Sequence, residues 1–501
     1  MIGITESVQP LLALLCPALG STLILIYGKR PNVRETWTLL ASLFQFLIVL
    51  SMVPTILDGK RIVCHLFTMF PGIDFGFHVD AFGLLFALTA SSLWILVSIY
   101  SIGYMRALKE HAQTRFYFCF AIAILGAVGV ALSGNLVTMY IFYEILTVST
   151  YPLVAHEQSS EALFAGRKYL VYLLTGGCFL LGAVALTYSI AGTTDFRPGG
   201  ILTGTMASRS MFIILFILFI IGFMKAAYMP FHSWLPTAMV APTPVSALLH
   251  AVAVVKAGVF GVVRTVAYIY GVDLMQELGL GILLASFAGF TMIVASLFAI
   301  AQDNLKRRLA YSTISQLAYI VFGVALLSPM GITGAMLHIP FHGFMKITLF
   351  LCAGSILVAS GKKNISEMAG IGRAMPVTML AFTVGALGMC GLPPACGFIS
   401  KWYLGLGTLE TGHFLFLAVL LISSLLDVVY FFPILYAAFF GSPEGVKSSL
   451  EKEGGIKEAP LAMVVPLSIT ALFSILFCFP NPVTDIILRL VRMAVSGGGG
   501  G

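Results

Sequence analysis

The stretch from Met211 to Pro230 reads MFIILFILFIIGFMKAAYMP, and it decides the fold class. Its first fourteen residues are apolar or glycine, Lys225 follows directly, and Pro230 ends the stretch. An apolar run that meets a lysine and a proline is typical of a membrane helix interrupted inside the bilayer, where the lysine must face a polar interior. The stretch therefore predicts a broken membrane span rather than a soluble core helix.

The rest of the chain repeats this apolar character. Of its 501 residues, 59% are hydrophobic and 10% are charged, whereas an ordinary soluble domain has about 45–50% and about 25%. Apolar runs long enough to cross a bilayer recur almost from end to end. We therefore predict an all-α polytopic membrane protein with about fourteen transmembrane helices, centred near residues 18, 47, 92, 123, 144, 178, 218, 254, 287, 316, 346, 388, 425 and 475.

The positions of Lys and Arg predict how the chain is threaded. Seventeen of the 28 fall in alternate loops on one side of the predicted bundle, seven fall on the other side, and four lie inside spans. Cytoplasmic loops carry the excess of positive charge, so both termini are expected outside. The first apolar stretch, Pro10 to Gly28, lacks a basic leader and a cleavage site and is expected to be a retained helix.

Two predicted spans are interrupted by proline and glycine. One interruption begins at Lys225 and continues to Pro244, and the other runs from Gly388 to Gly397 just before Lys401. A continuous helix would lose backbone hydrogen bonds at both places. Paired broken helices are typical of transporters built from inverted repeats, with the ion path at the breaks. Two plain loops between ordinary helices are the alternative.

Ionisable residues in the middle of spans are the candidate functional groups. Each costs roughly 2.5–3.5 kcal/mol on insertion scales, so each should face a polar interior. Four are lysines: Lys225, Lys256, Lys346 and Lys401. A partner charge that moves can load or unload the proton of a desolvated amine. Glu144, the mid-span carboxylate of the first six spans, is the natural partner of Lys225, although a static salt bridge is the alternative.

His338, His342 and Lys346 recur every four residues, so one face of one helix should carry a polar stripe about 12 Å tall. Histidine can hold a proton on one nitrogen and release it from the other, which suits the middle of a proton relay. His250 lies six residues before Lys256 and points in another direction, and a lone histidine in an apolar helix is usually an interhelical hydrogen bonder.

A haem held by two histidines is an alternative of another class. It fits the sequence poorly, because His338 and His342 share one helix face and His232 lies in a proline-rich interruption. The eight cysteines are scattered without a paired CxxC spacing, so they predict small buried side chains rather than a zinc site, a cluster or a redox pair. We therefore expect no cofactor and no metal ion.

Five motifs, taken in order, resemble the antiporter-like membrane subunits of respiratory complex I and of Mrp-type multisubunit cation/proton antiporters. The resemblance covers roughly residues 75 to 440 and is specific because the motifs keep their order and separations. They are Glu144 in its aromatic setting, Lys225–Pro236 followed by APTPVSALLH at 241–250 and VKAG at 255–258, Asp303–Gln316, HGFMK at 342–346, and GLPPACGFISK at 391–401.

The resemblance implies fourteen helices with two inverted five-helix repeats, each with a broken helix. The corresponding division is 1–110 for the first three helices, 111–272 for the first repeat, 273–441 for the second repeat, and 442–501 for a cytoplasmic loop, the last helix and a glycine-rich tail. It also implies a proton path. Its first-half pair is Glu144 and Lys225, with His232 and His250 also on the path, and Lys256 is the connecting lysine. His338, His342 and Lys346 form the central relay, and Lys401 is the exit group.

The branch of the family is harder to choose. Lys401 stands where one complex I subunit type carries glutamate, and the segment from Ser423 to Phe440 looks most like the D-type subunit of Mrp antiporters and its relatives in membrane-bound hydrogenases. Asp427 occupies a place where a neutral residue is expected. It either adds a proton or cation ligand to the path or is a buried group that stays protonated, and the sequence leaves both readings open.

The expected function is proton translocation by one membrane subunit of a multisubunit complex, in the prokaryotic cytoplasmic membrane. The alternative is a subunit of NADH-quinone oxidoreductase or of a membrane-bound hydrogenase or formate hydrogenlyase, pumping protons on redox chemistry in other subunits. Transport of Na⁺ stays open, since the sequence shows no oxygen-rich cation cage. We expect other membrane subunits as partners, no nucleic acid, and no redox or hydrolytic chemistry in this chain itself.

Overall fold

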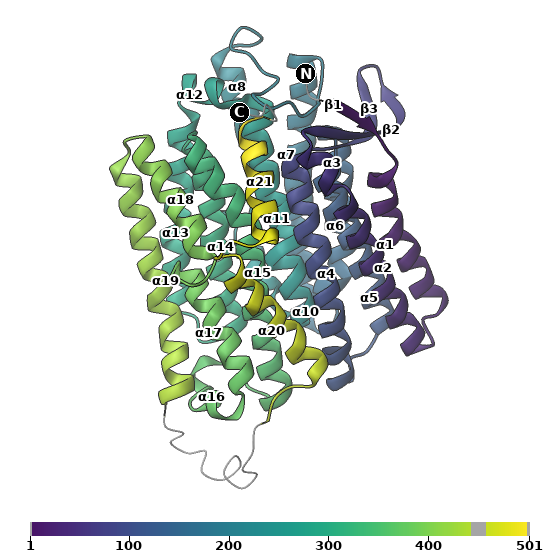
Figure 1. Ribbon diagram of the computed structural model, residues 1–501, viewed down its shortest axis with the longest axis vertical. Coiled ribbons are helices and arrows are strands. Elements are labelled where there is room, and N and C mark those ends of the chain that lie inside the picture. The colour runs from purple at the N-terminus through teal and green to yellow at the C-terminus, as the bar shows by residue number, and fades with distance from the viewer. Residues whose placement is uncertain (1–2, 442–456, 498–501) are drawn as a thin grey trace.

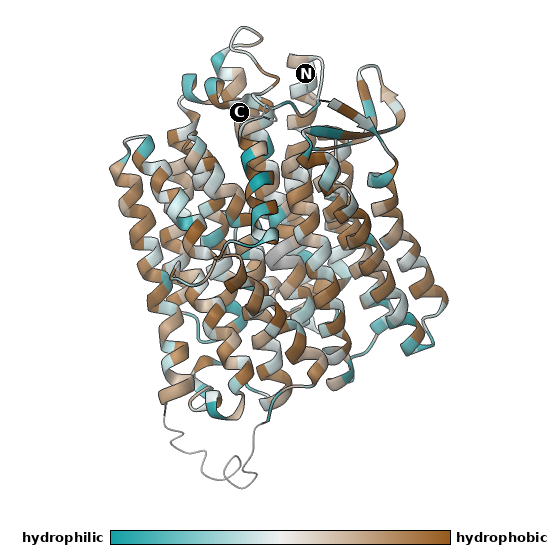
Figure 2. Cartoon of the chain, in the orientation of Figure 1, coloured by the Kyte–Doolittle hydropathy of each residue, from teal (hydrophilic) through white to brown (hydrophobic). Residues whose placement is uncertain are grey.

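A computed structural model describes residues 3–441 and 457–497, with side chains outside 249–252. Its helices stand side by side in one bundle, with a small sheet over one end (Figure 1). Residues coloured as hydrophobic dominate the helices along the bundle, and hydrophilic residues gather at its two ends (Figure 2). This distribution is the one that a bilayer imposes on a bundle of spanning helices.

The first part of the chain contributes long helices and then a run of short ones. The long helices are α1 (Gln9–Ile26), α2 (Pro31–Ser51), α4 (Ala81–Ala107), α5 (Gln113–Leu132), α6 (Leu136–Val154), α7 (Ser160–Ala191) and α8 (Arg209–Gly222), with the short α3 (Val53–Leu57) after α2. The short run is η1 (Met224–Ala226), α9 (Trp234–Thr237), η2 (Ala238–Val240), α10 (Thr243–Val245), η3 (Ser246–Ala253), α11 (Val254–Arg264), η4 (Thr265–Tyr270) and α12 (Val272–Glu277).

The second part repeats the alternation of long and interrupted helices. Its elements are α13 (Leu280–Ile300), α14 (Leu305–Ala325), α15 (Pro329–Ser360), η5 (Ile365–Glu367), α16 (Ile371–Ala374), α17 (Pro376–Cys390), α18 (Gly397–Glu410), α19 (Phe414–Phe440), α20 (Leu461–Leu476) and α21 (Pro482–Val495). Helix α15 is central, since it packs against α4, α14, α17, α18 and α20.

Side chains at the helix starts explain where many helices begin. An Asp, Asn or Ser at the N-cap accepts a hydrogen bond from a backbone N–H of the first turn and so satisfies a donor that the helix cannot. The residues that do so are Asp80, Asn135, Ser159, Ser208, Asn304, Ser328 and Asn481.

The sheet was not predicted from the sequence. Strand β1 (Gly3–Glu6) pairs in parallel with β2 (Lys60–Phe70), and β2 pairs antiparallel with β3 (Ile73–Val79). The β2–β3 hairpin turns at Gly72, whose φ of 76° favours glycine. The segment between the second and third predicted spans was read as a loop, because its alternation of buried Ile62 and Cys64 with exposed neighbours is short and lies beside much stronger helical signals.

All fourteen predicted span centres fall inside a helix of the described residues. Nine helices of the described residues are long and apolar enough to cross a membrane, and three more apolar helices, Arg209–Gly222, Pro376–Cys390 and Leu461–Leu476, are shorter. The membrane class is therefore confirmed. The number of fourteen crossings, the inverted repeats and the four-part division of the chain stay predictions.

Both predicted helix breaks are confirmed. Helix α8 ends at Gly222 and is followed by a 3₁₀ turn and irregular backbone, and α17 ends at Cys390, six residues before α18. The last predicted span differs from expectation, since α20 and α21 are separate helices joined through Pro480 and Asn481. The end of α21 lies at the same end of the bundle as β1 (Figure 1). The predicted cytoplasmic loop at 442–456 and the glycine tail at 498–501 lie outside the described residues.

Candidate functional site

The predicted polar stripe lies inside the bundle on the continuous helix α15. His338, His342 and Lys346 are completely buried. The two imidazole rings stack with centroids 5.6 Å apart and planes 20° apart. None of the three side chains is exposed on the surface of the bundle, as a relay requires, while transfer of protons along the stripe stays a prediction.

Each end of this stripe is fixed by a hydrogen bond to a neighbouring helix. The Nε2 of His338 lies 3.0 Å from Gln316 Oε1 on α14, and its Nδ1 lies 2.8 Å from Ser400 Oγ on α18. Since Gln316 Oε1 can only accept, Nε2 carries the proton in this arrangement. Lys346 Nζ donates to Ser312 Oγ at 2.7 Å. The ring nitrogens of His342 have no hydrogen-bond partner among the described residues.

Asp427, on α19, makes hydrogen bonds with three buried side chains. Its Oδ2 accepts from Lys401 Nζ at 2.7 Å and from Gln316 Nε2 at 2.8 Å, while its Oδ1 lies 2.5 Å from the Tyr430 hydroxyl. The side chain is completely buried. A carboxyl group surrounded by an ammonium and two further donors is held as an acceptor on both oxygens, which is the arrangement of a charged carboxylate.

A continuous line of hydrogen bonds connects Lys346 with Asp427. The Tyr430 hydroxyl donates to Ser312 Oγ at 2.9 Å and is also the donor facing Asp427 Oδ1. Its single proton can serve only one of these two acceptors at a time. Lys346, Ser312, Tyr430 and Asp427 are therefore linked in that order, and the contact between Tyr430 and Asp427 is a short hydrogen bond.

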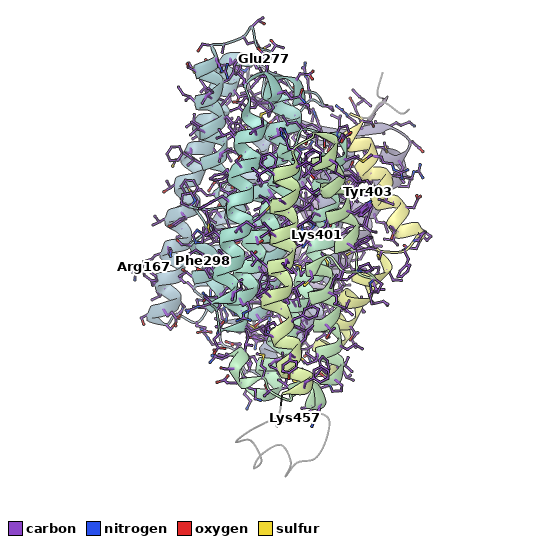
Figure 3. The ribbon with its side chains drawn as sticks, turned by 90° about the vertical axis from the view of Figure 1, so that its left-hand side faces the viewer. Arg167, Glu277, Phe298, Lys401, Tyr403 and Lys457 are labelled. Atoms are coloured by element: carbon purple, nitrogen blue, oxygen red, sulfur yellow. The ribbon has the colours of Figure 1, made fainter. Side chains whose placement is uncertain are left out.

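The break between α17 and α18 explains the position of Lys401. Where α17 ends, the carbonyl of Met389 has no helical partner, and Lys401 Nζ donates to it at 2.7 Å. The same ammonium lies 4.7 Å from the centre of the Tyr319 ring. Lys401 lies between Glu277 at one end of the bundle and Lys457 at the other (Figure 3). The broken helix thus holds a cation deep in the bundle beside Asp427.

The break after α8 holds the first-half lysine in a related way. Lys225 is completely buried, lies 3.2 Å from the centre of the Tyr143 ring, and donates to the Tyr143 carbonyl. The carbonyl of Met224 accepts from the Ala227 N–H at 2.9 Å and from Trp234 Nε1 at 3.2 Å, and that of Gly222 accepts from the Tyr143 hydroxyl at 3.3 Å. The unwound backbone is therefore satisfied by side chains around Lys225.

Glu144 does not form the expected ion pair with Lys225. The two charges interact electrostatically, but no Lys225 nitrogen lies within 4.0 Å of the carboxylate. Neither carboxylate oxygen makes a hydrogen bond of normal geometry among the described residues. Instead Glu144 lines an open hollow of about 730 Å³ between α5 and α6, with Tyr140 and Val148 among the lining residues. Tyr143 and Glu144 are consecutive residues of α6, so their side chains point in different directions. Lys225 contacts Tyr143, and Glu144 lies on another face of the helix.

Lys256 lies between the two halves. Its side chain is completely buried on α11, and its Nζ has no hydrogen-bond partner among the described residues. Its charge acts on both His338 and His342. The predicted role of a connecting lysine is consistent with this position, although no hydrogen bond joins it to the stripe.

Of the other two histidines predicted for the path, the structure describes the side chain of His232 alone. His232 is half-buried in the irregular segment after α8, next to the rings of Phe298 and Tyr311. The prediction for His250 lies outside the described side chains. The geometry does not support the haem alternative, since the stacked rings of His338 and His342 leave no space for one iron between them.

Sequence reasoning assigned no role to three residues that complete the network: Ser312, Gln316 and Tyr430. A signal was present, because Ser312 and Gln316 are four residues apart on α14 and Tyr430 is three residues after Asp427, so each pair shares a helix face. Which face meets α15 depends on how the helices pack, and that information is absent from a local pattern.

Comparisons with known proteins identify the family of the chain. Residues 133–427 match the family described as NADH:quinone oxidoreductase/Mrp antiporter, and residues 70–117 match the family described as NADH-ubiquinone oxidoreductase (complex I), chain 5 N-terminus.

Curated relatives of two kinds are similar to the chain. NADH-quinone oxidoreductase subunit N of Desulforudis audaxviator is 34% identical over 74% of this chain and 75% of its own length. The A-type subunit of the Na⁺/H⁺ antiporter of Alkalihalophilus pseudofirmus is 30% identical over 97% of this chain, which spans 62% of that relative. The match to the antiporter protein thus leaves more than a third of its length uncovered.

Two solved assemblies contain chains with the same fold. One chain belongs to the Mrp complex from Dietzia sp. DQ12-45-1b, with a TM-score of 0.83, 22% identity, and coverage of 98% of this chain and 96% of that one. The other belongs to an archaeal membrane-bound sulfane sulfur reductase, with a TM-score of 0.85, 24% identity, and coverage of 98% and 100%. At these identities the likeness concerns the fold.

Proposed function

Because the chain belongs to the family of membrane subunits shared by NADH:quinone oxidoreductase and Mrp antiporters, we propose that it translocates protons through its buried Lys346, Asp427 and Lys401 network. The chain is an integral membrane protein. It works as one membrane subunit of a larger assembly, as its relatives named as subunits do.

The line of hydrogen bonds from Lys346 to Asp427 is the observation that carries this proposal. Once the Tyr430 hydroxyl turns its proton to Asp427 and the Ser312 hydroxyl turns to donate to Tyr430, Asp427 takes the Tyr430 proton, Tyr430 takes the Ser312 proton and Ser312 takes one from Lys346. One proton then moves from the Lys346 ammonium to the Asp427 carboxylate, although each atom moves only a short distance. Hydroxyl groups suit this transfer because each can accept and donate at once.

The ion pair with Lys401 gives this transfer a consequence. Protonation of Asp427 removes the charge that Lys401 faces at 2.7 Å, and Lys401 keeps the Met389 carbonyl as its partner. A lysine that has lost its counter-charge is a better proton donor than one that is paired. Lys401 can therefore release its own proton to the Ser424 hydroxyl, 3.3 Å away, when Asp427 receives one, so the two proton transfers are linked within the second half.

The first half supplies a second element of the same kind. Lys225 lies at the break after α8, Glu144 interacts with it electrostatically, and Lys256 lies between this element and the histidines of α15. We assign Glu144 and Lys225 to proton loading in the first half and Lys256 to connection of the two halves. His232 and His250 are assigned to the path only through the family motif.

The assembly is proposed to take one of two forms. The match to Na⁺/H⁺ antiporter subunits over 97% of this chain favours a Mrp-type cation/proton antiporter. The relative with 34% identity, an NADH-quinone oxidoreductase subunit, favours a complex driven by redox chemistry in other subunits. In both forms the N-terminus and C-terminus face the outside of a prokaryotic cytoplasmic membrane, in agreement with the distribution of Lys and Arg.

Tyr430→Phe tests the proposal because it removes only the hydroxyl between Ser312 and Asp427. We expect coupled proton movement to fall at least about tenfold, since positioned proton transfer contributes about 10²–10⁴-fold to a rate. The measurement is the initial rate of pH-sensitive dye quenching in vesicles that hold the intact complex.

Tyr436→Phe is the matched control, because Tyr436 lies on the same helix with 68% of its surface exposed. Its transport rate should equal that of the wild type. Normal transport by Tyr430→Phe at wild-type abundance would contradict the proposed path.

A further inference from the structure

Two histidines and a glutamate meet at a place that the proton path does not use. Glu110 and His111 lie in the turn between α4 and α5, and His156 follows the last residue of α6. Glu110 Oε2 is 3.8 Å from His156 Nε2 and 4.0 Å from His111 Nδ1, and the two imidazole ring centres are 4.9 Å apart. One ligand atom from each of the three residues lies within 4.8 Å of the others.

His156 is the unusual member of this cluster. It has no exposed surface, yet neither ring nitrogen makes a hydrogen bond of normal geometry within the described residues, although the His111 backbone lies beside it. A buried imidazole normally pairs both nitrogens, because an unpaired buried polar atom is costly. Its ring instead packs edge-on against Phe116 and faces Glu110 and His111. A buried nitrogen without a hydrogen-bond partner that faces a carboxylate and a second imidazole is available as a metal ligand.

The charges around the cluster are compatible with a cation. Glu110 is 18% exposed, and the nearby Glu157 carboxylate adds a second negative charge that acts on it. The guanidinium of Arg115 is the neighbouring positive group, and it donates to the backbone carbonyl of His156 at 2.9 Å rather than to either carboxylate. Among the described residues no Lys or Arg forms an ion pair with either carboxylate, although Lys306 interacts electrostatically with Glu157.

We propose that Glu110, His111 and His156 form a binding site for Zn²⁺. Two imidazole nitrogens and one carboxylate oxygen, with a fourth position left for water, are a common zinc donor set. Tetrahedral coordination with bonds of about 2.0–2.2 Å places ligand atoms about 3.4 Å apart, so the observed separations must close by no more than about 1.5 Å. His111, half-exposed in its turn, can supply this movement by rotating its side chain.

A zinc ion at this place would add a link between segments that the hydrogen bond from Arg115 to the His156 carbonyl already connects. It would tie the α4–α5 turn to the end of α6, the helix that carries Tyr143 and Glu144. The site lies at the end of the bundle opposite the sheet, away from the Asp427 network, because α4 begins directly after β3 and runs the length of the bundle (Figure 1). The ion is therefore a clamp on the helix ends, independent of proton transfer in the second half.

The test measures zinc directly in the purified complex that contains the chain. Wild-type complex is stripped with a chelator, incubated with Zn²⁺ alone, passed through a desalting column and analysed for zinc by mass spectrometry. His111→Ala and His156→Ala are each expected to lose about one zinc per copy of this chain relative to the wild type. With Co²⁺ as the probe, the wild type should show visible absorption bands of tetrahedral cobalt that both variants lack.

His65→Ala is the matched control, because His65 faces only one carboxylate, that of Asp74 at 3.2 Å, and lies on the sheet. It should retain the wild-type amount of zinc. His111 is exposed, so His111→Ala should fold even if the buried His156→Ala variant does not. Equal zinc in the wild type and in His111→Ala, whether zero or one, overturns the proposal.

Discussion

Replacing Asp427 by Asn should uncouple the second half of the path. The carboxylate accepts from Lys401, Gln316 and Tyr430, with both oxygens in use. Asn keeps one oxygen and similar size, but its NH₂ group must face either Tyr430 or the pair formed by Lys401 and Gln316. At least one donor then meets another donor, and Lys401 loses its counter-charge.

The structure sets the size of the effect on stability. Removing one partner of a buried ion pair costs about 3–5 kcal/mol, because the other charge stays buried. Lys401 keeps the Met389 carbonyl at 2.7 Å and Ser424 Oγ at 3.3 Å, so the cost should fall near about 3 kcal/mol. Thermal unfolding of the purified complex should show this as a lower midpoint for the variant.

Transport should fail for a separate reason. If Asp427 ionises during the cycle, Asn removes a titrating group, and the rate profile from about pH 6 to about pH 9 should lose one limb as well as height. The assay is dye quenching in vesicles at a series of pH values. A flat, wild-type profile for Asp427→Asn would refute the assignment of Asp427 to the path and favour a carboxyl group that only donates and accepts hydrogen bonds.

A second variant separates stability from transport. In Asp427→Asn combined with Lys401→Met both members of this ion pair are absent, so neither is left facing a missing partner and most of the lost stability should return. Transport should stay low, because both proton-carrying groups are absent. Recovery of transport together with stability would show that the ion pair is only a structural contact.

Two further predictions concern the first half. Lys225→Ala and Glu144→Ala should each abolish coupled proton movement in vesicles while the complex assembles normally on native gels; normal pumping by Glu144→Ala would reject the pair. Gly258→Ala should instead prevent assembly, because a Cβ there would lie 2.6 Å from the Lys225 carbonyl carbon at the helix break, whereas Gly182→Ala, with open space around it, should assemble normally. Equal yields of these two variants would contradict the close packing.

The sequence alone determined the membrane class, both helix breaks and the groups that would be buried. These properties are local, since the cost of a lysine or a proline within an apolar run does not depend on which helix lies beside it. The stripe of His338, His342 and Lys346 could also be predicted from the sequence, because residues four apart share a face of any helix. Each of these predictions required only the period of the helix and the chemistry of the bilayer.

The partners of the buried charges were decided by tertiary structure. Lys401 pairs with Asp427, whereas Lys225 takes the carbonyl of Tyr143 in place of the expected Glu144. A rotation of α6 by one residue position would present Glu144 to Lys225 in place of Tyr143. No local sequence pattern fixes that rotation.

The sheet and the proposed zinc site, which the sequence did not predict, also depend on tertiary packing. The sheet pairs Gly3 with Lys60, and the proposed zinc ligands join Glu110 to His156. Such contacts link residues far apart in sequence, so they exist only when many helices have packed together. The sequence determines which side chains need a partner, because burial cost belongs to the side chain. The partner itself is chosen by the packing of whole helices, since their rotation and offset settle which atoms come within hydrogen-bond distance.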